Sequence, residues 1–147
     1  MSLDPKRLRR LVKQRERLEH VQEGVLAAAT RLHTERARAL DAVRAERFAL
    51  FDEGLASAGA VDPEALASAS AYIVRLERDI EMRRAALAHS AAQVEAERLR
   101  LLERRRDRKA MEFLLDRQLA EHRRLQLRAT GIVLDELASN RWLASQT

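Results

Sequence analysis

The sequence has no cysteine, two prolines, four glycines and only five aromatic residues, namely three Phe, one Tyr and one Trp. The absence of cysteine excludes disulfides, thiol catalysis and cysteine-based metal sites. So few aromatic residues leave little material for a wide core or a deep cleft. We therefore expect a fold held together by aliphatic stripes rather than by a globular interior.

Motifs for nucleotide binding, hydrolysis and metalloprotease chemistry are also missing: the sequence has no GxGxxG, GxxxxGK[ST], GxSxG or HExxH. No histidine has a second histidine at i,i+4, and histidines that face solvent or lie at the edge of a helix–helix interface are the more common case. The four histidines are His20, His33, His89 and His122. We predict no enzyme activity, no cofactor, no metal site and no small-molecule substrate.

Charge is plentiful. Charged residues make up 35% of the chain, the net charge is +5 and the pI is near 10.6. A basic balance favours an acidic partner, which can be nucleic acid, an anionic membrane face or an acidic protein surface. Residues 1–5 lead straight into a charged segment, and no apolar run is long enough to cross a bilayer. We expect a soluble cytoplasmic protein, with peripheral membrane association left open.

The dominant pattern is an apolar repeat that advances in alternating steps of three and four residues from Leu66 to Ile132. An unbroken 3.5-residue repeat of this length, with no internal proline, is typical of a coiled-coil helix. Its positions are Leu66, Ala69, Ile73, Leu76, Ile80, Arg83, Leu87, Ser90, Val94, Glu97, Leu101, Arg104, Arg108, Met111, Leu115, Gln118, His122, Leu125, Ala129 and Ile132.

A second helix pattern precedes it. Asp4-Pro5 and Asp62-Pro63 both have the form of a helix start, with Asp as N-cap and Pro at the first helical position. Gly54 and Gly59 lie in the only convincing break between them. In the first pattern two four-residue steps around Arg36 predict a stutter, and we expect close approach of the other helix to explain Gly24. The apolar positions used are Leu8, Leu11, Val12, Leu18, Val21, Val25, Ala28, Leu32, Leu40, Val43 and Leu50.

The predicted fold class is all-α: two long helices form an antiparallel coiled-coil hairpin, and the second helix is longer and overhangs the first. We expect a single domain over 1–147, with helices at about 4–52 and 63–139, a turn at about 53–62 and a short tail. Folding about residue 57 predicts that Leu40 faces the region of Ile73 and Leu76. The overhang begins after Met111, and Gly131 and Ser139-Asn140 suggest that it kinks or frays.

Basic residues gather in two segments, 6–13 and 98–109, which this register places at the same end of the hairpin. Pairs such as Asp79 with Arg83 and Glu103 with Arg106 account for much of the charge as an ordinary solvated face. Around Arg104 to Lys109, however, only Asp107 is available as a local partner, so an electropositive contact surface is the competing interpretation.

The other end of the hairpin holds three of the aromatic residues. Phe48 and Phe51 fit a hydrophobic plug in the bend. Tyr72 lies beside Ile73, which belongs to the stripe of residues where the two helices meet (the seam), and it can serve as an exposed anchor for a protein partner. Trp142 lies in a polar tail, where docking onto another surface is the one role that we can suggest.

Two segments resemble the FliJ family of flagellar export proteins. The stretch Tyr72-Ile-Val-Arg-Leu-Glu-Arg-Asp-Ile-Glu is similar to the opening of that family's second helix. The stretch Glu103-Arg-Arg-Arg-Asp-Arg-Lys-Ala-Met-Glu, followed by Leu134-Asp-Glu-Leu-Ala138, resembles its charged run and late Asp-Glu. The resemblance extends over nearly the whole chain in length and layout, but Gly131 and the residues after Ala138 depart from it. The stalk proteins of virulence type III secretion systems look similar too.

The resemblance implies a non-enzymatic, stalk-like protein of the bacterial flagellar (type III) export apparatus, which serves motility. Such proteins link the ring of the export ATPase to the membrane export gate and contact export chaperones, on the cytoplasmic face of the cell membrane. It implies ATPase-contact candidates at Arg9, Arg10, Arg104, Arg105, Arg106 and Arg108. It implies export-gate-contact candidates at Phe48, Tyr72 and Leu76.

Two alternatives from other classes stay open. A basic coiled coil can bind nucleic acid through its arginine clusters, although the sequence has few aromatics to stack on bases and no reader motif, so no nucleic acid is expected. A scaffolding coiled coil can dimerise through the overhang after Met111. The mass in solution separates these, because the stalk interpretation expects a monomer or a weak associate. The sequence does not separate flagellar from virulence secretion or name the chaperones.

Overall fold

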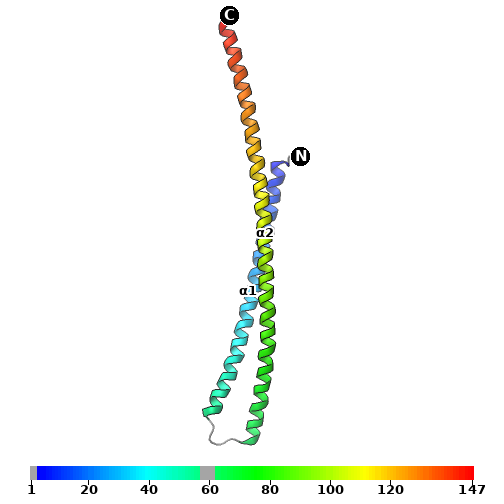
Figure 1. The fold of residues 1–147 in the computed structure, drawn as a ribbon, viewed down its shortest axis with the longest axis vertical. Helices are drawn as coiled ribbons and strands as arrows, with labels where there is room; N and C mark the ends of the chain where they lie inside the picture. Colours follow the sequence, from blue (N-terminus) through cyan, green and yellow to red (C-terminus); the bar gives the residue numbers. More distant parts are fainter. Residues whose placement is uncertain (1–2, 57–61) are drawn as a thin grey trace. The chain divides into compact units, whose positions relative to one another are not determined.

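A computed structural model describes residues 3–56 and 62–147. The described residues form two helices and no strand: α1 is Pro5–Ala56 and α2 is Pro63–Gln146. They pack against each other and α2 is the longer, so the predicted all-α fold is confirmed (Figure 1). Residues 57–61 of the predicted turn lie outside the described residues.

Both helices begin where the sequence predicts, because an aspartate caps each one. Oδ1 of Asp4 accepts a hydrogen bond from the backbone N–H of Lys6 at 3.1 Å, and Oδ1 of Asp62 accepts one from that of Glu64 at 3.3 Å. The aspartate satisfies an N–H that has no partner within the helix, and the proline after it needs none.

The helix ends differ from the prediction. The first helix continues to Ala56 rather than 52, and the second continues to Gln146 rather than 139. α2 continues as a helix through Gly131 and residues 139–140, so the fraying predicted there is wrong. Trp142 accordingly lies in a helix and not in an irregular tail.

The chain divides into two compact units, each built from both helices. One unit contains Met1–His20 and Glu103–Thr147, and the other contains Val21–Leu102. The core of the second unit is a cluster of Leu40, Val43, Leu76 and Ile80, against which Leu50 and Leu87 pack. The cluster confirms that Leu40 faces Leu76. The prediction of a single domain over 1–147 stays a prediction.

The 3.5-residue repeat of α2 is visible in its burial. Every repeat position from Ile73 to Gln118 is buried or half-buried, including the polar positions Arg83, Ser90 and Glu97. The repeat positions from His122 onward are exposed. Pairing with α1 therefore extends about two turns beyond Met111, where the overhang was predicted to begin.

The middle of α1 contacts α2 through a different stripe from the predicted one, whereas the predicted positions Leu8, Val12, Leu40, Val43 and Leu50 are confirmed at the interface. Val21, Val25, Ala28 and Leu32 are exposed, and the residue after each of them is half-buried instead. The observed seam alternates steps of three and four without a stutter, so the stutter predicted at Arg36 is wrong. Its members are Leu8, Val12, Arg15, Glu19, Gln22, Leu26, Ala29, His33, Arg36, Leu40, Val43, Arg47 and Leu50.

Hydrogen bonds across the seam explain why polar residues occupy it. Nδ1 of His33 lies 3.0 Å from Oγ of Ser90, and the amide of Gln22 donates to the Glu97 carboxylate at 2.5 Å. Buried polar groups that have partners escape most of the desolvation cost. A prediction based on apolar residues alone selects the neighbouring stripe. Gly24 is exposed and a Cβ there would meet nothing within 4 Å, so close approach of α2 does not explain it.

Candidate functional site

The basic segments of both helices lie in the first unit, and an acidic side chain of α1 stands among them. Glu19 forms ion pairs with Arg105, at 3.4 Å, and with Arg108. Arg108 also pairs with Glu112 one turn further along α2, at 2.8 Å. Glu19 is a seam residue whose side chain is only 12% exposed, and that of Arg108 is 24% exposed. These contacts form an ion-pair network, a name that we keep for Glu19, Arg105, Arg108 and Glu112.

The network shifts the pKa values of two of its members, Glu19 and Arg108. The hydrogen bond that Arg108 donates to Glu19 lowers the pKa of that carboxyl below its usual value, and the positive charges of Arg108 and Arg105 lower it further. The same bond, with the one to Glu112, raises the pKa of the Arg108 guanidinium. Arg108 is thus a structural cation that holds α2 to α1, and much of its hydrogen-bonding capacity is already used.

This network corrects the sequence-based view of the basic run, in which Asp107 was the single local acid. Folding about residue 57 places Glu19 opposite residue 95, whereas the structure joins it to Arg105 and Arg108. Because α1 ends four residues later than predicted, the pairing shifts along α2, and long arginine side chains extend the reach further. Only the correct alignment of α1 against α2 would have identified Glu19 as the partner of Arg105 and Arg108.

Other arginines of the predicted contact surface keep their charge available. Arg9, Arg10 and Arg106 are exposed, and Arg104 is half-buried at a seam position. Within the part of the chain that the structure describes, none of these four forms an ion pair. Arg15 pairs with Asp107 at 3.7 Å, which places Arg9 and Arg10 across from roughly residues 110–113. We call Arg9, Arg10, Arg104 and Arg106 the basic surface.

The predicted export-gate contacts, Phe48, Tyr72 and Leu76, belong to the second unit and have three different environments. Phe48 is 72% exposed, so it does not plug the bend, and Phe51 is half exposed as well. Tyr72 is partly exposed and its hydroxyl donates a hydrogen bond to the Glu46 carboxylate, which raises the pKa of the tyrosine. Leu76 is 5% exposed in the core cluster, so its side chain offers almost no surface, and its role as a contact stays a prediction.

Phe48 and Tyr72 form two surface points rather than one patch. Tyr72 bonds to Glu46, and Phe48 lies two residues further along α1, where the helix presents a side about 200° away. A partner that contacts both must wrap around α1 or use two segments.

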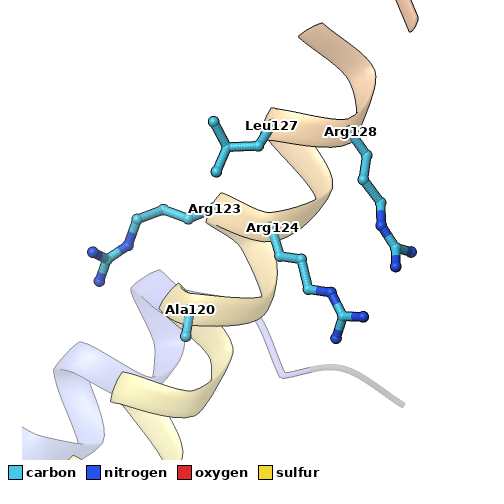
Figure 2. Close-up of a pocket in the computed structure, with 5 residues that line it drawn as sticks. All are labelled: Ala120, Arg123, Arg124, Leu127 and Arg128. Carbon is cyan, nitrogen blue, oxygen red and sulfur yellow. The ribbon is translucent and has the colours of Figure 1, made fainter. Parts of the chain in front are cut away.

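Over residues 3–56 and 62–147 no three His, Asp or Glu side chains come together as a possible metal site. In the same ranges neither helix has a stretch both long and apolar enough to cross a bilayer. Shallow grooves occur on α2 after Arg117, and Figure 2 shows the one lined by Ala120, Arg123, Arg124, Leu127 and Arg128.

The fold and these surfaces define a protein class: paired long helices whose chemistry lies in charged and apolar side chains on their outer faces. Comparison with protein families then gives the particular family. The model described as "Flagellar FliJ protein" matches residues 5–147, so the chain belongs to the FliJ family. This family is associated with flagellar export and is not known for enzymes. No curated protein and no solved structure matches the chain.

Proposed function

We propose that this protein is the non-enzymatic link between the export ATPase ring and the membrane export gate of a flagellar export apparatus. It works at the cytoplasmic face of the membrane, which it reaches through its partners, and it contacts export chaperones. Family membership supports the setting. The observation that carries the division of labour is that the two candidate surfaces differ in chemistry and belong to different units.

The basic surface is the ATPase contact in this proposal. Its arginines are free of ion pairs among the described residues, so a partner that supplies carboxylates meets cations that are already solvated and available. Arg105 and Arg108 are given a different role, because the ion-pair network already engages them. Their contribution is to hold α2 against α1 through Glu19, close to the basic surface.

In this proposal the exposed aromatic side chains of Phe48 and Tyr72 contact the export gate. Phe48 carries a large exposed apolar area, and exposed aromatic side chains are frequent anchors of protein interfaces. Tyr72 offers a ring edge and a hydroxyl that Glu46 holds in place. Leu76 supports this surface only from beneath, through the core cluster.

The test of the ATPase contact is ATP hydrolysis by the cognate export ATPase with and without this protein. We expect the wild type to stimulate hydrolysis and an Arg104→Glu/Arg106→Glu variant to lose the stimulation. The matched control is Arg31→Glu/Arg38→Glu, which changes the charge equally at exposed positions of the other unit. Absence of both stimulation and co-purification for the wild type would remove the proposal.

The gate contact is tested separately by co-purification with the cytoplasmic part of the gate protein. Phe48→Ala and Tyr72→Ala are expected to weaken it while leaving ATPase stimulation intact. Phe113→Ala removes a similarly exposed phenylalanine of the first unit and serves as the control. An equal loss of co-purification in the control would show that the assay reports nonspecific hydrophobic binding, and it would contradict the assignment.

A further inference from the structure

The middle of α1 carries an apolar stripe that α2 does not cover. Val21, Val25 and Leu32 are exposed, and each lies one residue before a half-buried seam position. The stripe therefore lies about 100° away from the seam around the axis of α1. We define the lateral stripe as Val21, Gly24, Val25, Ala28 and Leu32, whose spacing keeps them on one side of the helix.

A hydrogen bond between the helices shows which part of α2 lies beside this stripe. The hydroxyl of Tyr72 donates to the carboxylate of Glu46, so these residues share one side of the helix pair. A coiled coil repeats every seven residues, and two such steps back from Glu46 reach Leu32. Two and three steps on from Tyr72 reach Ala86 and Gln93. The side chains that α2 places beside the stripe here are thus small or uncharged, and they leave room for a third helix.

Cations edge the lateral stripe. Arg31 and Arg38 are exposed on its outer side, and neither forms an ion pair within residues 3–56 and 62–147. On this side of α1 between residues 21 and 38, Glu35 is the carboxylate that partly balances them. The excess of positive charge favours a partner that supplies carboxylates. A second copy of this chain would bring the same excess of arginine, so charge disfavours self-pairing.

Gly24 has no explanation within the helix pair. It is exposed, and a Cβ at this position would meet nothing within 4 Å. Glycine inside a helix is less favourable than alanine. Gly24 and Ala28 lie one turn apart, so they form a low place in the stripe where the backbone of another helix can approach closely. A flat lipid surface would gain nothing from the missing side chain.

We propose that the lateral stripe binds a helix of a partner protein, an amphipathic helix with an apolar inner face and carboxylates along its edges. Its apolar side chains pack on Val25 and Leu32, and its carboxylates reach Arg31 and Arg38. The three helices then form a local bundle. The inference uses only the pairing of α1 with α2, so it does not depend on the ATPase or gate contacts.

The test is fluorescence anisotropy of a labelled synthetic peptide titrated with the full chain. The peptide has three heptads, with leucine at positions a and d and glutamate at e and g. We expect binding that Val25→Glu/Leu32→Glu weakens by at least about tenfold, because apolar contact is lost and like charges meet. The matched control is Val74→Glu, which changes an exposed valine of α2 that follows a seam position and so lies on another side.

Two further variants separate the charge from the shape of the site. A peptide with lysine in place of glutamate should bind at least about tenfold more weakly, and Arg31→Glu/Arg38→Glu should reverse this preference while ATPase stimulation stays intact. Gly24→Leu should raise the melting temperature of the chain, because it improves the helix, and yet weaken binding of the glutamate peptide. A purely structural glycine would not give these opposite effects.

Several outcomes overturn the proposal. They are equal binding of the two peptides, binding that Val74→Glu abolishes and Val25→Glu/Leu32→Glu does not, and absence of binding by the wild type. Two others would assign the stripe to a different occupant. One is a rise in mass from 16.8 kDa that Val25→Glu/Leu32→Glu prevents, and the other is binding to phosphatidylglycerol vesicles, without peptide binding, that the same variant loses.

Discussion

Nδ1 of His33 and Oγ of Ser90 lie 3.0 Å apart across the seam, and the serine is almost completely buried. The serine hydroxyl also donates to the carbonyl oxygen of Leu87 at 2.8 Å. Since a hydroxyl has one proton, the histidine then donates its Nδ1–H to Ser90. This pair satisfies two polar groups in the middle of a two-helix interface.

Removing one partner of this pair should destabilise the protein. Ser90→Ala leaves the His33 N–H without its acceptor, and we expect a loss of about 1 kcal/mol in the free energy of unfolding. Urea denaturation followed by circular dichroism measures it. Ser139→Ala alters an exposed serine of the same helix and should cause no loss. The double variant His33→Leu/Ser90→Ala should recover the loss, and a further loss would contradict this account.

The core cluster should be sensitive to truncation. Ile80→Ala removes the most deeply buried aliphatic side chain of the second unit, and we expect a loss of about 2–4 kcal/mol from transfer and cavity terms. Thermal and urea denaturation measure it. Met82→Ala shortens an exposed side chain on the same helix and should cost little. Equal effects of the two substitutions would be incompatible with a core at Ile80.

The ion-pair network should make stability depend on pH. The folded state lowers the pKa of Glu19, so this group stabilises the fold above its unfolded pKa, and the contribution is lost as the pH falls through the folded value. Glu19→Gln should therefore lower the melting temperature at pH 7 and have little effect at strongly acid pH. Glu16→Gln, at an exposed position of α1, is the control. A melting temperature shift that is the same at both pH values would refute the linkage.

The last turns of α2 should exchange their amide hydrogens fastest. Residues 122–146 form a helix whose side chains have almost no partners in the chain, and an isolated helix of this length is marginal in water. In dilute solution we expect hydrogen exchange there to be orders of magnitude faster than over 73–101. Equal protection of the two segments in a monomeric sample would show that contacts with α1 are not what stabilises α2.

The sequence was sufficient for the helices, their starts and the seam of α2, because capping residues and the 3.5-residue repeat are local signals. It was not sufficient for the central part of the α1 seam, where Gln22, His33 and Arg36 lie. The partners of these residues lie on the other helix, so only the register shows why they are at the interface.

The same limit applies to the candidate site. Which arginines are engaged depends on Glu19, which is remote from Arg108 in sequence. Likewise the sequence alone did not show that Leu76 is buried and Phe48 exposed, because this depends on how the two helices pair.

The exposed residues Val21, Val25 and Leu32 give the middle of α1 a second apolar face beside the one that it buries. Turning the helix by one residue, about 100°, would exchange these aliphatic side chains for Gln22 and His33 at the interface. The same turn would take Leu40 and Val43 out of the core cluster, so hydrophobicity favours the observed orientation at that end of the interface and the alternative one only around residues 21–32. Around residues 21–36, Glu97, Ser90 and the carbonyl of Ala86 supply hydrogen-bond partners to the polar residues that α1 places at the interface. These polar contacts therefore help to specify the rotation of α1 about its axis. Substitutions that replace Gln22 and His33 by apolar residues would weaken that specification.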